Sequence, residues 1–472
     1  MEDIIKEKRN SKDLTVGSPI MAILLFALPL LFGNIFQQFY SVVDSLIVGN
    51  FCGDNALTAV SSSGPLINLL IGLIQGITVG AGILIAQHFG AKNYDRLSKA
   101  VHTTVAFCFV LGIGLTIIGV AFTPTLLLWM NTDPEVIGEA SAYFRVYFMG
   151  SIFTVMYNAG AAIYRAVGDS KHPLYYLIIA SFVNLVFDFL FVAIFKWGVI
   201  GAAAATVLAQ LVSCIFVYTK LIREKTVYQL RIKDIKFDKQ ELLMVLRYGV
   251  PSGLQNSIVS LSNVFILSNI NSFGKIASES YGVYSKIEGF STLPSGSFSM
   301  ALSTYVGQNI GAKKYKRVRK GAVQGLILSM AVTEFLALIL FIFAPSFFRM
   351  FTKTPEIIAF GTQQMRQVSL FYALLAFAHG MAGVLRGAGY SKTATTVLLV
   401  CWVAIRIIFI PVALSIPSLN KVTTIYWFYP LTWSLSFIVF TILALAIASY
   451  KTKQRKKNGE EEENNELAIS AE

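Results

Sequence analysis

Long apolar segments recur from one end of this 472-residue chain to the other, and they constrain its fold more than any other feature. A helix needs about 20 apolar residues to cross the hydrocarbon core of a bilayer. Backbone in lipid must satisfy its own hydrogen bonds, so runs of this length are expected to be helices and not barrel strands. We expect twelve spanning helices, at residues 20–48, 57–87, 97–121, 141–163, 173–195, 200–221, 243–270, 281–308, 322–343, 362–385, 393–414 and 424–448.

Charged residues are few, and most of them lie between the apolar segments. Only 14% of the residues are charged and 55% are hydrophobic, whereas soluble domains carry about 25% charged residues. In a soluble protein the net charge of +13 would suggest nucleic acid. Here the basic residues flank membrane segments, so we expect anionic membrane lipids as partners, and no nucleic acid.

The basic residues also predict how the helices are oriented. With the N-terminus in the cytoplasm, most of the 39 Lys and Arg residues fall in cytoplasmic segments. The segments left outside hold Lys196, Lys275, Arg349, Lys353 and Lys421. By the positive-inside rule we expect a multi-pass protein of the cytoplasmic (cell) membrane with both termini inside. Residues 450–472 are first basic and then acidic, and we expect them to be disordered.

Short motifs recur between the two halves at a nearly constant offset. The Gly-Ala-Lys motif at residues 90–92 returns at 311–313, and Arg165 with its following Gly-x-Ser-Lys returns at Arg386, both 221 positions later. Two units of six helices, the same way up, predict an all-α membrane protein of two pseudo-symmetric lobes that move by alternating access. The expected division is an N-terminal lobe at 1–222, a cytoplasmic linker at 223–241, a C-terminal lobe at 242–449 and the tail at 450–472.

Two acids lie inside apolar segments of the first half, Asp44 in the first and Asp188 in the fifth. A carboxylate at the centre of a membrane helix costs about 2.5–3.5 kcal/mol, so it persists only with a partner or a task. Asn184 shares a helix face with Asp188, and Gln37 and Tyr40 share one with Asp44. If the carboxylates meet, one binds a proton or a small cation lies between them. The sequence does not choose between H⁺ and Na⁺ as the bound ion. Two other roles for the acids are also possible: a structural pair that binds no ion, or a solvated helix end.

The second half has no acids at the corresponding places. An offset of 221 pairs Asn184 and Asp188 with Ile405 and Phe409, and an offset of 222 pairs Asp44 with Ile266. If the acids served helix packing alone, both lobes would need them. The acids of the first half therefore indicate a coupling-ion site.

The sequence does not indicate a function for the other ionisable residues within the apolar segments. Glu288 is expected to pair with Lys286 or to face the outer vestibule, and Glu334 to meet a polar neighbour. His379 is ambiguous, and Arg406 needs a partner that the sequence does not identify. The Gly-rich stretch at residues 72–82 favours close helix packing.

Motifs of catalysis are missing from the sequence. There is no Walker motif, zinc-ligand spacing or nucleophile elbow. We therefore expect no enzyme activity, no catalytic residues and no cofactor beyond a coupling ion.

These features together resemble the multidrug and toxic compound extrusion (MATE) family, over roughly residues 18–450. The resemblance implies efflux of small cationic or amphiphilic drugs and toxins, and hence antibiotic resistance, driven by H⁺ or Na⁺. It implies that Asp44, Asn184, Asp188 and Thr206 bind the coupling ion, with Na⁺ as a possible metal there. Gln37, Tyr40 and Asn158 would line the substrate cavity. A monomer is expected.

One departure selects a branch of that family. The NorM-like branch carries acids on its seventh and tenth segments, but here the seventh has none and the tenth has His379. This favours the DinF-like branch, which includes the MepA-type pumps. Two alternatives stay open: a flippase for lipid-linked precursors from the same superfamily, and a membrane scaffold or receptor that transports nothing.

Overall fold

The computed structural model describes the backbone of residues 13–52, 54–129 and 136–469, and in these ranges it is helical, without strands. The helices of the N-terminal half are α2 (Pro19–Cys52), α3 (Asp54–Gly90), α4 (Tyr94–Trp129), α5 (Ile137–Met149), α6 (Ser151–Ala166), α7 (Lys171–Asp188), the π-helix η1 (Phe189–Ile194) and α8 (Gly198–Arg223). Those of the C-terminal half are α9 (Lys239–Asn271), α10 (Lys275–Gly311), α11 (Tyr315–Arg349), α12 (Pro355–Ser369), α13 (Tyr372–Gly387), α14 (Ser391–Leu398), the π-helix η3 (Leu399–Ala404), α15 (Ile405–Leu414) and α16 (Val422–Ile469).

Twelve helical segments result when bent or interrupted helices are counted as single spans. Within the described residues, eight are long and apolar enough to cross a membrane alone. Two more are bent pairs, α5 with α6 at 45° and α12 with α13 at 54°. The remaining two, α9 and α10, are long enough at 33 and 37 residues but contain many polar residues, chiefly serine. This agrees with the predicted fold of twelve helices in two lobes.

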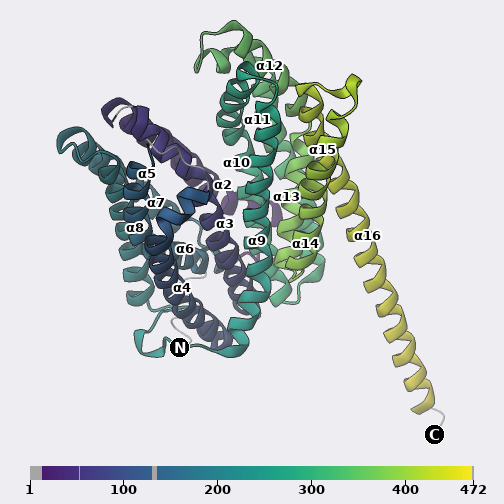
Figure 1. Ribbon diagram of the computed structural model, residues 1–472. Helices are drawn as coiled ribbons and strands as arrows, with labels where there is room; N and C mark the ends of the chain where they lie inside the picture. Colours follow the sequence, from purple (N-terminus) through teal and green to yellow (C-terminus); the bar gives the residue numbers. More distant parts are fainter. Residues whose placement is uncertain (1–12, 53, 130–135, 470–472) are drawn as a thin grey trace.

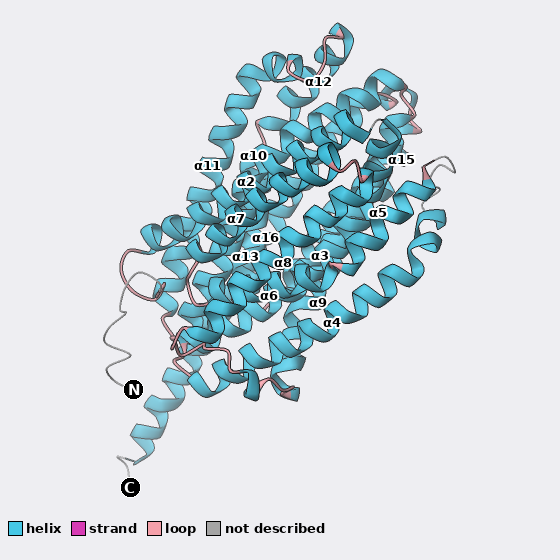
Figure 2. Ribbon diagram, turned by 90° about the vertical axis from the view of Figure 1, so that its left-hand side faces the viewer, coloured by secondary structure: helices cyan, strands magenta, loops and turns pink. Residues whose placement is uncertain are grey.

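The two halves of the chain form two helix bundles that lie side by side (Figure 1). The bundles converge at the end of the molecule that carries the chain termini, and their helices diverge towards the opposite end. The view turned by 90° also places the start of α2 and the end of α16 at one end of the bundle (Figure 2). The first and the last described helix therefore begin and end on the same side, as expected for an even number of spans.

The tail differs from its prediction. Residues 450–469 were expected to be disordered, but they continue α16 as a helix to Ile469, and this helix projects away from the bundle (Figure 1). Lys, Glu and Gln have high helix propensity. A run of them can therefore extend an existing helix without burying any apolar surface.

The internal repeat appears in the backbone conformation as well as in the sequence. Lys92 and Lys313 both adopt the left-handed conformation, with φ of 55° and 57°. Gly168 and Gly389 have φ of 89° and 88°. Because non-glycine residues rarely take φ above zero, the same unusual turn at equivalent lysines is strong evidence of two copies of one unit.

The lobes meet most closely where α3 crosses α9. A Cβ atom at Gly76 would lie 2.0 Å from the Gly253 nitrogen, and one at Gly80 would lie 2.3 Å from the Gly249 nitrogen. Each glycine thus faces a glycine of the other lobe, which lets the two backbones touch. The prediction that the Gly-rich stretch serves close helix packing is confirmed.

At the converging end, two glutamines join the lobes in a pseudo-symmetric way. Gln87 Nε2 donates to the Gly387 carbonyl at 3.0 Å, and Gln308 Nε2 donates to the Ala166 carbonyl at 2.8 Å. Both donors and both acceptors are 221 positions apart. Gln308 Oε1 also accepts from the Leu14 amide at 3.0 Å. We call these bonds the glutamine latch; they hold the predicted cytoplasmic end closed.

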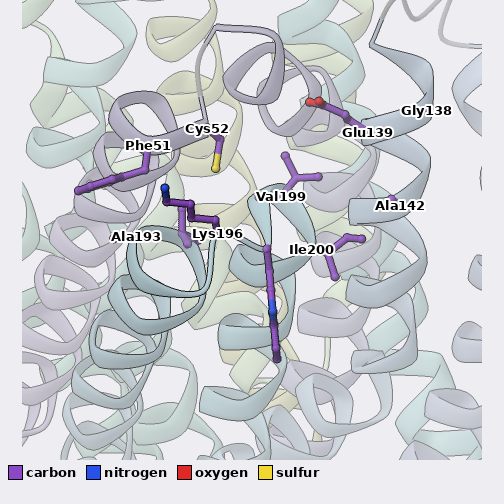
Figure 3. Close-up of a pocket in the computed structure, with 12 residues that line it drawn as sticks. Phe51, Cys52, Gly138, Glu139, Ala142, Ala193, Lys196, Val199 and Ile200 are labelled. Atoms are coloured by element: carbon purple, nitrogen blue, oxygen red, sulfur yellow. The ribbon is translucent and has the colours of Figure 1, made fainter.

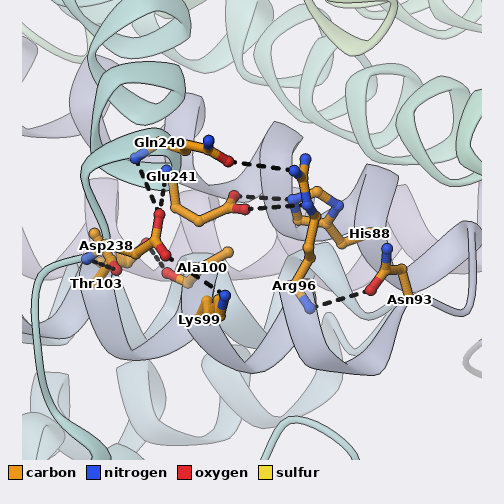
Figure 4. Close-up of polar contacts among 10 residues, drawn as sticks. His88, Asn93, Arg96, Lys99, Ala100, Thr103, Asp238, Gln240 and Glu241 are labelled. Carbon is orange, nitrogen blue, oxygen red and sulfur yellow. Dashed lines mark hydrogen bonds and ion pairs between the residues drawn. The ribbon is translucent and has the colours of Figure 1, made fainter.

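The linker is anchored on α4 and α3, as Figure 4 shows. Asp238 caps α9 by accepting from the Gln240 and Glu241 amides at 3.0 and 3.1 Å, and its own amide donates to Thr103 Oγ1 at 3.0 Å. The buried Glu241 carboxylate contacts His88 Nε2 at 2.9 Å. The first turn of the C-terminal lobe is therefore tied to helices of the N-terminal lobe.

Candidate functional site

An acidic pair occupies the interior of the N-terminal lobe. Asp44 comes from α2, and Asp188 is the last residue of α7, directly before the π-helix η1. Asp188 is 1% exposed, and the two carboxyl groups lie within hydrogen-bonding range of each other. Two ionised carboxylates cannot donate to each other. By distance and angle, neither Asp188 oxygen nor Asp44 Oδ1 has a hydrogen-bond partner within the described residues, although the Asn184 amide lies near Asp188.

Asn184 and Thr206 complete the group expected from the sequence. Asn184 is 2% exposed and lies one turn before Asp188 on α7. Its Nδ2 atom reaches Thr206 Oγ1 on α8 at 3.5 Å, a long hydrogen bond. The structure thus brings the four predicted residues together from three helices. Buried carboxylate oxygens without a donor fit a proton or a small hard cation, because either would supply the missing positive charge.

Tyrosines flank the acids. Tyr40 shares a hydrogen bond with Gln37 and lies within electrostatic range of Asp44 and Asp188, as expected for residues of the same helix face. Asn158, in contrast, donates to the Thr154 carbonyl of its own helix at 2.9 Å. Its predicted place beside the site therefore remains a prediction.

Sequence reasoning missed two tyrosines on α5. Tyr143 lies within electrostatic range of Asp44, Tyr40 and Asp188, and Tyr147 within range of Tyr40. Their rings stack, with centroids 6.2 Å apart and planes at 18°. The spacing of four residues puts both rings on one helix face, which was the available signal. Only the packing of α5 shows that this face meets the acids.

A cavity of about 560 Å³ opens at the diverging end of the N-terminal lobe (Figure 3). Its lining residues are Phe51, Cys52, Gly138, Glu139, Ala142, Val192, Ala193, Lys196, Trp197, Gly198, Val199 and Ile200. Val192 and Val199 also belong to an apolar cluster with Val48 and Tyr143. Val192 follows Asp188 by four residues and Tyr143 lies within electrostatic range of both acids, so this cluster adjoins both the cavity and the acids.

The ionisable groups of the C-terminal lobe have partners that the sequence did not identify. Tyr372 donates to Glu288 Oε1 at 3.2 Å, in place of the expected Lys286. Arg406 donates to Thr432 Oγ1 through Nε at 3.1 Å and through its terminal nitrogen at 2.8 Å. His379 packs edge-on against Trp402, with ring centroids 5.1 Å apart.

Glu334 behaves as expected. Its Oε2 accepts a hydrogen bond from the Ala373 amide at 2.7 Å. The prediction of a polar neighbour is confirmed, and this acid has a structural partner where α11 meets the start of α13.

Known proteins resemble this chain over most of its length. The model of the MatE family matches residues 29–190 and 251–412. The probable multidrug resistance protein YoeA of Bacillus subtilis is 31% identical over 424 residues, which cover 88% of this chain and 91% of that protein. The multidrug export protein MepA of Staphylococcus aureus is 21% identical over 412 residues, covering 87% and 90%.

Solved structures share the fold. A multidrug resistance MATE family transporter of the MOP superfamily, in its outward-facing conformation, superposes with a TM-score of 0.89 at 21% identity. The match covers 95% of this chain and 100% of that one. With a family model matched in both halves and the same fold of two six-helix lobes, the chain belongs to the MatE family of membrane transporters.

Proposed function

We propose that this protein is a cation-coupled multidrug efflux antiporter of the cytoplasmic membrane, working as a monomer with both termini inside. The observation that carries the proposal is the Asp44–Asp188 pair inside the N-terminal lobe, three of whose four carboxyl oxygens are buried without a hydrogen-bond partner. The names of its relatives, multidrug resistance and multidrug export proteins, support the cargo class.

The acid pair can couple an ion to a conformational change. An ion bound between Asp44 and Asp188, with Asn184 and Thr206 beside it, removes the repulsion between the carboxylates. The packing of α2, α7 and α8 around the site then differs between the loaded and empty states. Ion and drug drive each other across the membrane only if their affinities differ between these states, by a factor of about 5–150 in typical coupled systems.

A flippase for lipid-linked phosphates is the nearest alternative. Its cargo is anionic, so a cavity that faces it should be cationic. The lobe here presents two carboxylates instead, which favours cationic cargo. A scaffold or receptor would keep its function with neutral residues in place of both acids. The experiment below distinguishes such a protein from a transporter.

The test is efflux of a cationic dye from proteoliposomes under an imposed H⁺ or Na⁺ gradient. The wild type should respond to one of these gradients, which identifies the coupling ion. Asp44→Asn and Asp188→Asn should each abolish the response. Glu334→Gln is the matched control, since it neutralises an intramembrane acid with a structural partner in the other lobe. Gradient-driven efflux in both Asp variants would overturn the proposal.

A further inference from the structure

Arg406 occupies the place in the C-terminal lobe that Asn184 occupies in the N-terminal lobe. The two matched ranges, 29–190 and 251–412, begin and end 222 positions apart, and near their ends this offset pairs Asn184 with Arg406. The loop motifs give 221, which would pair Asn184 with Ile405. The π-helix η3 explains the difference, because it precedes Arg406 whereas η1 follows Asn184. A π-helical turn accommodates one extra residue.

The two residues make similar contacts, although their threonine partners are 226 positions apart, about one helical turn from the offset of 222. Asn184 Nδ2 bonds Thr206 Oγ1 between α7 and α8, and Arg406 bonds Thr432 Oγ1 between α15 and α16. In each lobe, then, the fifth span is joined to a threonine of the sixth span. The two residues differ in charge: Asn184 of the N-terminal lobe has a neutral amide, and Arg406 of the C-terminal lobe has a positively charged guanidinium.

The guanidinium is held firmly within the lobe. Arg406 is 3% exposed, and its central carbon lies 4.3 Å from the centroid of the Tyr429 ring. The Tyr429 and Tyr281 hydroxyls are 3.0 Å apart. Arginine stays charged even when buried, and it stacks on aromatic faces. This lobe therefore contains a permanent positive charge that cannot leave.

An acid faces that charge across tyrosines. Glu288 of α10 lies within electrostatic range of Arg406, but in the described part of the chain no cationic nitrogen lies within 4.0 Å of its carboxylate. Glu288 is held instead by Tyr372, whose hydroxyl is 3.0 Å from that of Tyr284. The lobe thus contains an acid and a cation in one cluster with buried tyrosines, close enough for each to influence the other electrostatically.

We propose that Arg406 is a tethered cation that fills, in the C-terminal lobe, the position that the exchangeable coupling ion takes in the N-terminal lobe. The inference rests on the proposed function of the acid pair. Because Arg406 cannot dissociate, the C-terminal lobe is permanently loaded, and only the N-terminal lobe exchanges an ion during the cycle. Arg406 acts as a positioning residue, through the charge that it supplies to Glu288 and the tyrosines.

Removing the tethered charge should create a vacant cation site. Arg406→Gln keeps a donor for Thr432 but leaves Glu288 uncompensated, so the purified variant should lose thermal stability. Millimolar guanidinium chloride should then raise its Tm, because a ligand that binds only the folded state stabilises it. Sodium chloride at equal concentration controls for ionic strength. Arg406→Lys is the conservative variant and should behave as the wild type.

The double variant Arg406→Gln/Glu288→Gln separates charge from packing. With both charges removed, no cation is needed, so its Tm should recover and the effect of guanidinium should vanish. Apparent guanidinium affinity should fall by about tenfold or more between the single and the double variant. Should Arg406→Gln fail to fold, a soluble double variant still supports the proposal, and an insoluble one contradicts it.

Two results would overturn the inference: no stabilisation of Arg406→Gln by guanidinium, or an equal response in the double variant. Neither depends on efflux, so a failure of the proposed antiport, seen in the Asp44→Asn and Asp188→Asn assays, is distinguishable from a failure here. In transport, the wild type and Arg406→Lys should show the same number of coupling ions per dye.

Discussion

The glutamine latch offers a quantitative test of alternating access. Gln308 is fully buried and makes two of the bonds, to the Ala166 carbonyl at 2.8 Å and from the Leu14 amide at 3.0 Å. Gln87 makes one, to the Gly387 carbonyl at 3.0 Å. Ala166 and Gly387 belong to the lobe opposite their donors. The bonds to the Ala166 and Gly387 carbonyls must break when the converging end opens, and they therefore stabilise the closed state only. The bond from the Leu14 amide need not break, because Asn309, Lys314 and Arg317 also hold residues 14–17 on the C-terminal lobe.

The perturbation is to replace each glutamine by methionine, which has similar volume but no amide. A typical hydrogen bond contributes about 0.5–1.5 kcal/mol net. Gln308→Met and Gln87→Met each lose one bond between the lobes, about 0.5–1.5 kcal/mol, which shifts the balance between closed and open by about 2–12-fold. The two variants should therefore have effects of similar size.

The assay is double electron–electron resonance in lipid nanodiscs. Spin labels are placed by Asp95→Cys on α4 and Lys316→Cys on α11, two exposed and equivalent positions of the two lobes. The four native cysteines are first replaced by serine. The population at the short distance should fall in both Gln87→Met and Gln308→Met. Gln75→Met, an exposed glutamine on the same helix as Gln87, is the control.

Two outcomes would refute the reasoning about the latch. One is an unchanged distance distribution in Gln308→Met, which would mean that these bonds are remade in the open state. The other is an equal fall in the Gln75→Met control, which would mean that the effect does not come from the bonds between the lobes.

Two further predictions concern stability and are both measured by thermal unfolding of the purified protein. Gly76→Ala should force α3 and α9 apart, since its Cβ would lie 2.0 Å from the Gly253 nitrogen; overpacking of this kind costs about 1–3 kcal/mol. Gly114→Ala on α4, where nothing lies within 4 Å, should be neutral or stabilising, and equal losses in the two would count against the contact. Hydrogen bonds from the Glu241 amide, and then the Gln240 amide, hold the pKa of Asp238 below its usual 3.8. The contribution of the Asp238 carboxylate to stability is therefore fully present above pH 3.8 and is lost as the pH falls through the lowered pKa. The decrease in Tm caused by Asp238→Ala should thus become smaller in acid. A decrease in Tm that does not depend on pH would contradict this account.

Much of the fold was accessible from the sequence because its signals are local. The length of an apolar run is enough to predict a membrane helix, and the Gly-Ala-Lys repeat is enough to predict two copies of one unit. The same holds for the acids: Asp44 and Asp188 stood out because a charge inside an apolar run is costly. Composition did not predict the structure of the tail, because a polar run can either be disordered or extend a preceding helix, as it extends α16 here.

The contacts between segments far apart in the chain were decided by the tertiary structure. Tyr143 carried only a weak spacing signal, and its place near Asp44 depends on how α5 packs against α4 and α8. Arg406 had no identifiable partner until α16 and α10 brought Thr432 and Glu288 to it.

The sequence by itself determined where the chain enters the membrane, how many times, and which residues pay an electrostatic cost for being there. Only the tertiary structure decided which of those residues meet and which glutamines join the two lobes. The physical reason is that hydrophobic length and charge are properties of single segments. Whether a carboxylate has a partner depends instead on helices that pack together although they lie more than a hundred residues apart, such as α2 and α7.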